Sequence, residues 1–304
     1  MPEPWEGIFT ALVTPMTVGE ELDEPRLGEM VEYLIGKAGV HGIIPLGSTG
    51  EYYALSPEER QRVVALTVEA AAGRVPVVVG TNAGSTRDAV AFSRQAEQQG
   101  ADGVMLAAPY YSLPTADELF EHFRAVDEAI DIPIMIYNYP GRTGVDMEPD
   151  LIGRLGELEH VGYVKESSGE ISRMSEITRR FGERSSEARE GAVTVFCGCD
   201  TGALEAFVLG LKGWVGGVVN VIPKQHVQLH ELAVVRGDFR AARDLYYQIL
   251  PLLALMEQGG KYTQFVKAGC EMMGQPVGPP RRPLLPPSEG ELSALRQLLE
   301  PFLP

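Results

Sequence analysis

A lysine at the end of an apolar run is the most unusual chemical feature of this sequence. Lys165 follows residues 161–164 (VGYV), a run typical of a buried β-strand, and lysine is rarely buried without a specific reason. A salt bridge with a nearby carboxylate is one explanation. Alternatively, loss of water lowers the pKa of a lysine from ~10 to ~7–8, which supplies the free amine that forms an imine with a carbonyl group. We therefore predict a lysine-imine (Schiff-base) enzyme.

Four further residues have side chains that suit this chemistry. Tyr137 ends another apolar run, and its phenol could transfer a proton during imine formation, although a tyrosine there also suits a core. Arg142 follows a Pro-Gly turn and could hold a substrate carboxylate by two hydrogen bonds, or could simply be an exposed loop residue. Ser48 and Thr49 stand between glycines, which suits either a small carboxylate or a tight turn between a strand and a helix.

The elements that must position these residues follow a regular alternation. Eight apolar or β-branched runs recur, and six of the seven intervals between them are near 30 residues, enough for a strand, two loops and a helix. The runs cover residues 8–13, 42–46, 75–79, 103–107, 132–137, 161–165, 193–197 and 214–219. Amphipathic patterns over residues 25–39, 57–72 and 86–99 predict helices between them.

This alternation predicts an α/β protein with a parallel sheet covered by helices. Eight units favour closure into a (β/α)8 TIM barrel. An open dinucleotide-binding sheet is the alternative, but no Gly-x-Gly-x-x-Gly follows the first strand. Ser56 before Pro57 predicts a helix start, and Gly39, Gly73 and Gly100 predict helix ends.

Helical patterns continue after the eighth run. They cover residues 225–235, 239–257, 261–273 and 288–299, and the proline-rich residues 276–287 between the last two predict a rigid strap over the C-terminal helices. We predict a catalytic barrel domain over residues 1–222 and a C-terminal helical extension, packed on the barrel, over residues 223–304.

In such barrels the active site lies at the carboxyl ends of the strands, so the residues there are considered together. Besides the five already named, Tyr111 follows the fourth run, Gly198 follows the seventh, and the eighth strand is expected to run through Gly216 to Asn220. One end of the barrel would thus carry hydroxyl, phenol, guanidinium and amine groups. Their occurrence together is better explained by a shared active site than by chance.

Composition excludes several other classes of protein. The net charge of −16 argues against nucleic-acid binding, which needs clustered cations. Neither a signal peptide nor a membrane span is recognisable, so we expect a cytoplasmic protein with no membrane partner. Three cysteines are too few for a disulfide framework, and His226 and His230 suit a helix surface better than a metal site. We therefore expect no metal and no cofactor other than the covalent imine.

The sequence resembles the dihydrodipicolinate synthase/N-acetylneuraminate lyase family of class I lysine-imine aldolases. The similarity covers essentially the whole chain, and its most specific parts are residues 47–51 (GSTGE), residues 137–144 (YNYPGRTG) and Lys165 with Glu166.

The resemblance implies a role for each candidate catalytic residue. Lys165 would attack the carbonyl of pyruvate or a similar keto acid, and Tyr137 would handle protons through carbinolamine, imine and enamine. Ser48 would pass protons between Tyr137 and Tyr111, and Tyr111 would come from a neighbouring subunit. A homotetramer or homodimer is therefore implied.

The resemblance also implies how substrates are bound. Thr49, Gly198 and the backbone around Val215 would bind the pyruvyl carboxylate or shape its site. Arg142 aligns with the arginine that in the synthases holds the carboxylate of aspartate semialdehyde. The leading prediction is therefore condensation of pyruvate with aspartate semialdehyde, a reaction of lysine biosynthesis.

Several departures from the synthase pattern keep alternatives open. Cys199 stands where many synthases have Asp, Gly216 where many have Ser, and Tyr52 with Tyr53 where small residues are usual. Aldolases or dehydratases of 2-keto-3-deoxy sugar acids thus remain alternatives. The N-acetylneuraminate lyase branch is less favoured because Thr201 replaces its second acid.

Two further alternatives belong to other classes. A keto-acid sensor or scaffold would keep the barrel without turnover, and a phosphate-binding barrel isomerase would not need Tyr137 and Arg142 together. Feedback inhibition by lysine is not expected, because Pro57, Arg60 and Gly84 replace the His, His and Asn of lysine-inhibited relatives.

Overall fold

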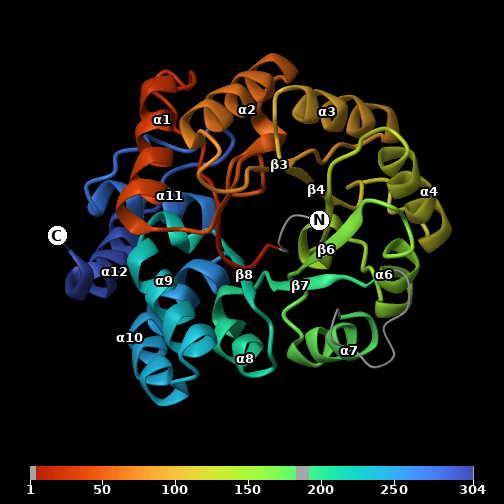
Figure 1. The fold of residues 1–304 in the computed structure, drawn as a ribbon. Helices are drawn as coiled ribbons and strands as arrows, with labels where there is room; N and C mark the ends of the chain where they lie inside the picture. The colour runs from red at the N-terminus through yellow and green to blue at the C-terminus, as the bar shows by residue number, and fades with distance from the viewer. Residues whose placement is uncertain (1–4, 183–191, 304) are drawn as a thin grey trace. The chain divides into compact units, whose positions relative to one another are not determined.

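Eight parallel strands form the framework of the computed structural model, which describes residues 5–182 and 192–303. The strands follow the order β2-β1-β8-β7-β6-β5-β4-β3 in one sheet, and a parallel bridge between Ile43 and Val77 joins β2 to the residue before β3. Helices alternate with these strands (Figure 1). The predicted α/β class and (β/α)8 TIM barrel are confirmed.

The chain divides into two compact units, which we describe separately. The first unit comprises Met1–Glu6 and Val78–Val215, and the second comprises Gly7–Val77 and Gly216–Pro304. The boundaries of these units do not coincide with the predicted domain boundary between residues 222 and 223. Grouping residues into compact units does not test where the catalytic domain ends, so the predicted domain boundary stays a prediction.

The first unit contains the strands that carry most of the predicted chemistry. Its elements are β3 Val78–Gly80, α3 Thr86–Gln98, β4 Gly103–Ala107, α4 Ala116–Asp127, β5 Ile134–Asn138, α5 Pro140–Thr143, α6 Pro149–Leu155, β6 Val161–Glu166, α7 Ile171–Phe181, β7 Thr194–Cys197, α8 Ala203–Val208 and β8 Gly213–Gly216. Every residue of β4, β5 and β8 is buried, as a parallel sheet covered by helices requires. Helices α6 and α7 pack together here.

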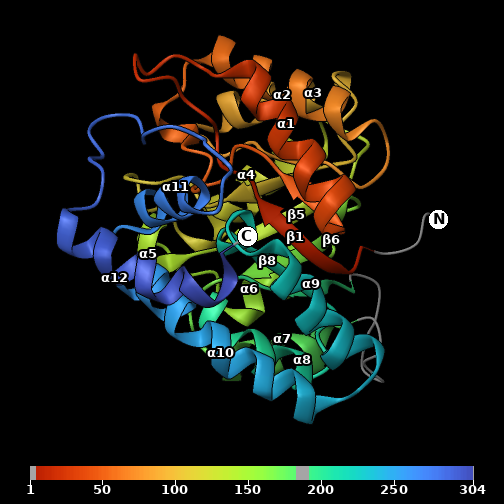
Figure 2. The ribbon, with the colours of Figure 1, turned by 90° about the vertical axis from the view of Figure 1, so that its left-hand side faces the viewer.

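The second unit combines the start of the chain with its C-terminal helices. Its elements are β1 Gly7–Ala11, α1 Glu24–Glu32, β2 Gly42–Ile44, α2 Pro57–Ala71, α9 Pro223–His230, α10 Phe239–Gln258, α11 Tyr262–Met272 and α12 Glu289–Leu299. Helix α1 packs against α2, and α10 contacts α9, α11 and α12; Figure 2 shows α10 and α12 side by side.

Helix boundaries follow the signals in the sequence. Ser56 forms a reciprocal capping box with Glu59 at the start of α2, and Ser288 caps α12 in the same way with Glu291. The first predicted helix ends at Gly39 as expected, with φ of 75°, but its last part is a π-helical turn, Tyr33–Ala38. A second π-helical turn, Glu231–Val235, continues α9.

The prediction that the eighth strand reaches Asn220 is wrong. Strand β8 ends at Gly216, and Val218–Asn220 forms a 3₁₀ turn. Asn220 explains the change because its side-chain amide donates to Ala11 O and Gly217 O, and its oxygen accepts from Val13 N at 3.2 Å. These bonds compete with extension of the strand.

The proline-rich segment, residues 276–287, was predicted to lie over the C-terminal helices. It contacts one of these helices and also residues near the start of α2. On α11, Glu271 accepts the backbone N–H groups of Val277 and Gly278. Arg281 binds the carboxylate of Glu59 with two guanidinium nitrogens, each at 2.7 Å, and also donates to Ala54 O. The segment is therefore anchored both to α11 and to the start of α2.

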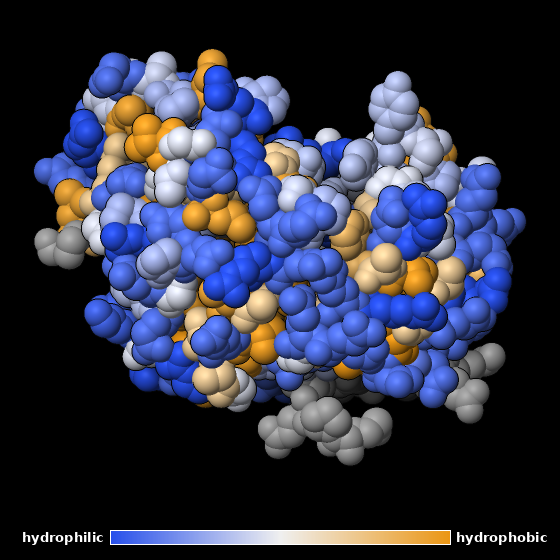
Figure 3. Space-filling model, turned by 90° about the horizontal axis from the view of Figure 1, so that it is seen from above, coloured by the Kyte–Doolittle hydropathy of each residue, from blue (hydrophilic) through white to orange (hydrophobic). Residues whose placement is uncertain are grey.

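Hydrophilic side chains dominate the face seen in Figure 3, where apolar side chains form only small, separate patches. None of the helices within residues 5–182 and 192–303 combines the length and the hydropathy needed to span a membrane.

A buried ion pair fixes the turn after β2. The carboxylate of Glu51 lies 2.6 Å from Lys267 Nζ, and both side chains are almost fully excluded from solvent. Lys267 also donates to Pro279 O, and Glu51 accepts the backbone N–H of Arg281. Glu51 itself has a left-handed backbone with φ of 56°. The ion pair thus holds this residue in an unfavourable conformation and ties it to the C-terminal segment.

We expect Lys267→Met to lower the free energy of unfolding by about 3–5 kcal/mol, because the carboxylate of Glu51 would stay buried without its counter-ion. The double variant Glu51→Gln, Lys267→Met should recover part of the loss, since no buried charge remains. Lys212→Met, which removes an exposed ion pair with Glu6, is the matched control and should cost under about 1 kcal/mol. Denaturant titration measures all three, and equal losses for Lys267→Met and Lys212→Met would contradict the interpretation.

Candidate active site

Strands β5 and β6 bring the two main candidate residues together. Tyr137 pairs in register with Lys165, so their side chains extend from the same face of the sheet. Lys165 Nζ lies 4.1 Å from the centroid of the Tyr137 ring, and Lys165 is only 5% exposed. The structure thus places an amine and a phenol side by side at the carboxyl ends of two strands.

The electrostatic environment of Lys165 favours the free amine. Burial lowers the pKa of Lys165 to about 8, while the negative charge of Asp200 acts in the opposite direction. Within residues 5–182 and 192–303 Lys165 forms no ion pair, so the salt-bridge explanation of its burial fails. At this pKa roughly a tenth of Lys165 is uncharged at pH 7, far more than for a lysine of ordinary pKa, and this is the form that nucleophilic attack requires.

Asp200 is a buried residue that sequence reasoning did not assign to the site. It lies just after β7, where its carboxylate accepts a hydrogen bond from Trp214 Nε1 at 3.1 Å. The available signal was its position two residues after Gly198 at the end of a strand. Its effect on Lys165 makes it an electrostatic partner of the predicted nucleophile.

Gly198 is placed against the aliphatic part of Lys165. A Cβ atom at position 198 would lie 3.0 Å from Lys165 Cγ and 1.9 Å from Ser167 Oγ. Ser167 Oγ donates to Gly198 O at 3.0 Å, so this close approach is part of the local structure. Only glycine fits here, while its predicted role in substrate binding stays a prediction.

Two loops of the first unit carry Arg142 and Tyr111. Arg142 lies on α5, a single turn after β5, and its side chain is exposed. Tyr111 is 97% exposed and has φ of 73°. A Cβ atom on Gly144 would lie 2.8 Å from Leu113 Cδ2, so the loop after β4 contacts the loop that carries Arg142. Val215 is buried within β8, and its backbone role stays a prediction.

Ser48 and Thr49 lie in the second unit. Thr14 Oγ1 donates to Gly50 O at 2.7 Å and holds the turn that contains them. Thr49 Oγ1 would lie 2.9 Å from a Cβ atom at Gly217, which leaves room only for glycine there. Tyr262, which sequence reasoning noted only as part of a helix, accepts the backbone N–H of Gly217 at 2.9 Å.

The structure therefore groups the predicted residues by unit. In the first unit it gathers Tyr137, Lys165 and Gly198 and adds Asp200; in the second it places Thr49 near Gly217. No group of three or more His, Cys, Asp or Glu side chains in the described part of the chain could hold a metal ion. His226 and His230, expected on a helix surface, are instead both buried, and burial lowers the pKa of His226 to about 4. The predicted absence of a metal or cofactor stays a prediction.

Comparison with known proteins decides the family. The model of the dihydrodipicolinate synthetase family matches residues 4–301. This chain belongs to that family. It is 36% identical over 300 residues to a protein of Methanospirillum hungatei named 4-hydroxy-tetrahydrodipicolinate synthase, with 98% of this chain and 99% of the relative covered.

Solved structures agree with this family. The dihydrodipicolinate synthase of Aquifex aeolicus matches with a TM-score of 0.89 at 35% identity, covering 98% of both chains. The chloride-inhibited enzyme of Acinetobacter baumannii, described as complexed with pyruvate, matches with a TM-score of 0.88 at 32% identity, again covering 98% of both chains. The family and the fold predicted from the sequence are thus confirmed.

The buried amine predicts a pH dependence of imine formation. Below the Lys165 pKa of about 8 the ammonium form dominates and cannot attack, so borohydride trapping of a small keto acid should become faster as the pH rises through about 8. Asp200→Asn removes a charge that raises this pKa, so the midpoint should move to lower pH. The exposed Asp131→Asn changes net charge equally and should leave it in place. A midpoint shared by all three proteins would contradict the role of Asp200.

Proposed function

We propose that this protein is a 4-hydroxy-tetrahydrodipicolinate synthase, which condenses pyruvate with aspartate semialdehyde in lysine biosynthesis. The observation that carries the proposal is the pairing of Tyr137 with a buried Lys165 whose pKa is about 8. A phosphate-binding isomerase would not require this pair. The name carried by the relatives supports the same activity.

The proposed chemistry uses the amine of Lys165 as a nucleophile. Its lone pair attacks the carbonyl carbon of pyruvate, and loss of water from the carbinolamine gives an imine. The imine withdraws electrons, so a proton leaves the methyl carbon and an enamine forms, which attacks the aldehyde carbon of the second substrate. Tyr137 is adjacent to the nitrogen and is the proposed carrier of protons in these steps.

Further roles follow as proposals from the family. Ser48 and Tyr111 would extend the proton relay from Tyr137, and Thr49 with the backbone at Val215 would bind the pyruvyl carboxylate. Arg142 would hold the carboxylate of aspartate semialdehyde, and its exposure on a short turn leaves the guanidinium available. We propose a cytoplasmic location, which fits a biosynthetic enzyme.

Borohydride reduction in the presence of pyruvate tests the covalent step. We expect a pyruvyl adduct on Lys165 that is lost in Lys165→Ala, because in the proposed mechanism Lys165 supplies the attacking amine. The exposed Lys212→Ala is the control and should still be labelled. An adduct mapped to another lysine, or none, would contradict the mechanism.

Substrate turnover separates the proposed synthase from its alternatives. A synthase should consume pyruvate only with aspartate semialdehyde, whereas an aldolase or dehydratase of 2-keto-3-deoxy sugar acids should cleave or dehydrate those compounds. A sensor would form the adduct and turn over neither. Preferential turnover of the sugar acids would overturn the synthase proposal while leaving the imine step intact.

Subunit mixing tests the proposed homotetramer or homodimer. Tyr111→Phe removes the phenolic proton and should lower activity by roughly 100-fold or more, and Lys165→Ala should be inactive. If Tyr111 reaches the site of a second subunit, hybrids of the two variants contain sites with both natural residues, and activity should rise well above that of either variant alone. Light scattering gives the subunit number. Hybrids no more active than the separate variants would exclude donation of Tyr111 between subunits.

A further inference from the structure

The segment that carries Arg142 leaves the sheet immediately after Asn138. Within it, Tyr139 O accepts the N–H groups of Arg142 at 3.0 Å and of Thr143 at 3.1 Å, and Thr143 Oγ1 donates to Val145 O at 2.9 Å. These bonds shape the turn but do not attach it to a strand. Some other interaction must set the position of Arg142 relative to Lys165.

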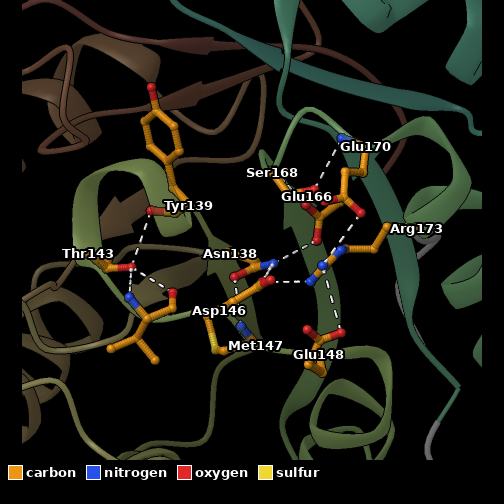
Figure 4. A network of polar contacts seen from close by, with 11 residues as sticks. Asn138, Tyr139, Thr143, Asp146, Met147, Glu148, Glu166, Ser168, Glu170 and Arg173 are labelled. Atoms are coloured by element: carbon orange, nitrogen blue, oxygen red, sulfur yellow. Dashed lines mark hydrogen bonds and ion pairs between the residues drawn. The ribbon is translucent and has the colours of Figure 1, made fainter.

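The side chain of Asn138 supplies this attachment, as Figure 4 shows. Its Nδ2 group donates to Asp146 Oδ1 at 3.1 Å and to Glu166 Oε2 at 3.0 Å, and its Oδ1 accepts Met147 N at 3.0 Å. An amide has two donor hydrogens and one acceptor oxygen, so each group of this fully buried side chain has a partner. Asn138 thereby joins both ends of residues 139–147 to the end of β6.

The partners of Asn138 are themselves held. Glu166 accepts the backbone N–H of Ser168 at 2.6 Å, which fixes the turn after Lys165. Arg173 of α7 donates to Asp146 at 2.6 Å and lies 3.7 Å from the carboxylate of Glu148 (Figure 4). The carboxylate of Asp146 is thus fixed from two sides, by Asn138 and by a guanidinium.

The network lies on the opposite face of the sheet from the proposed chemistry. Asn138 pairs in register with Glu166, one residue after the pair of Tyr137 and Lys165. Because side chains alternate between the faces of a strand, Asn138 and Glu166 point away from the amine and the phenol. They therefore act through backbone position and do not touch a substrate.

We propose that Asn138 is a positioning residue that sets the place of Arg142 relative to Lys165. The proposal rests on the proposed function, since it concerns the arginine that binds the carboxylate of the second substrate. The sheet itself places Tyr137 and Lys165, so loss of Asn138 impairs the second substrate far more than it impairs imine formation with pyruvate. Arg173 supports Asn138 by holding Asp146.

Kinetics of Asn138→Ala test this selectivity. We expect the KM for aspartate semialdehyde to rise, with a loss of up to about 100-fold in kcat/KM, because a displaced binding group is as harmful as an absent one. The rate of borohydride trapping of pyruvate on Lys165 should change less than about threefold, within the range of remote effects. Arg173→Ala should act in the same direction but less strongly.

A double-mutant cycle shows whether Asn138 acts through Arg142. If it does, Asn138→Ala adds little to the loss already caused by Arg142→Ala, whereas independent residues give losses that multiply. Arg180→Ala is the matched control, since Arg180 lies on the same helix and bonds to Asp150 of α6 without reaching the strand ends. Arg180→Ala should change neither the KM for aspartate semialdehyde nor the rate of pyruvate trapping.

Hydrogen exchange gives a readout that needs no activity. In Asn138→Ala the amides of Tyr139 and residues 141–147, above all that of Met147, should exchange faster, while those of β5 and β6 stay protected. If wild-type protein has no synthase activity, faster exchange confined to residues 139–147 still supports the positioning role, and the proposed function alone fails. Unchanged exchange, multiplying kinetic losses or equal impairment of pyruvate trapping would overturn the inference. If Asn138→Ala does not fold, the same kinetic and hydrogen-exchange measurements are made on Arg173→Ala, and the same results support or overturn the inference.

Discussion

The parallel pairing of β5 with β6 is the constraint on which the candidate site depends. Two successive register pairs, Tyr137 with Lys165 and Asn138 with Glu166, place four functional side chains at one end of the sheet. Since neighbouring residues face opposite ways, one pair is available for chemistry and the other for anchoring loops. A slip of one residue in this register would exchange the two faces and destroy both roles.

Two buried lysines show how surroundings decide the role of the same side chain. Burial lowers the pKa of both Lys165 and Lys267. Lys267 is compensated by the carboxylate of Glu51 and by a backbone carbonyl, so its charge serves the structure. Lys165 lies instead against the ring of Tyr137, with Asp200 as a weaker electrostatic influence. An incompletely compensated amine is suited to reaction, whereas a fully paired one is not.

Regular features of the fold were predictable because they depend on local pattern. The run 103–107 is the strand Gly103–Ala107 itself, and Ser56 begins the helix that its capping signal indicates. The prediction failed past Gly216, where the apolar residues continue but Asn220 bonds to the backbone of β1 and ends the strand. The bond to Ala11 joins residues 209 positions apart, which a local pattern does not reveal.

The sequence by itself determined the family and the barrel and indicated Lys165 as the residue proposed to carry the chemistry, because a lysine closing a buried strand and the motifs around it are visible in order along the chain. Only the tertiary structure decided that Asp200 acts on Lys165, and that Asn138 joins the Arg142 segment to Glu166. These relations depend on which strands are neighbours and on which face each side chain lies. Both are set by strand pairing between distant segments, which residue spacing does not encode.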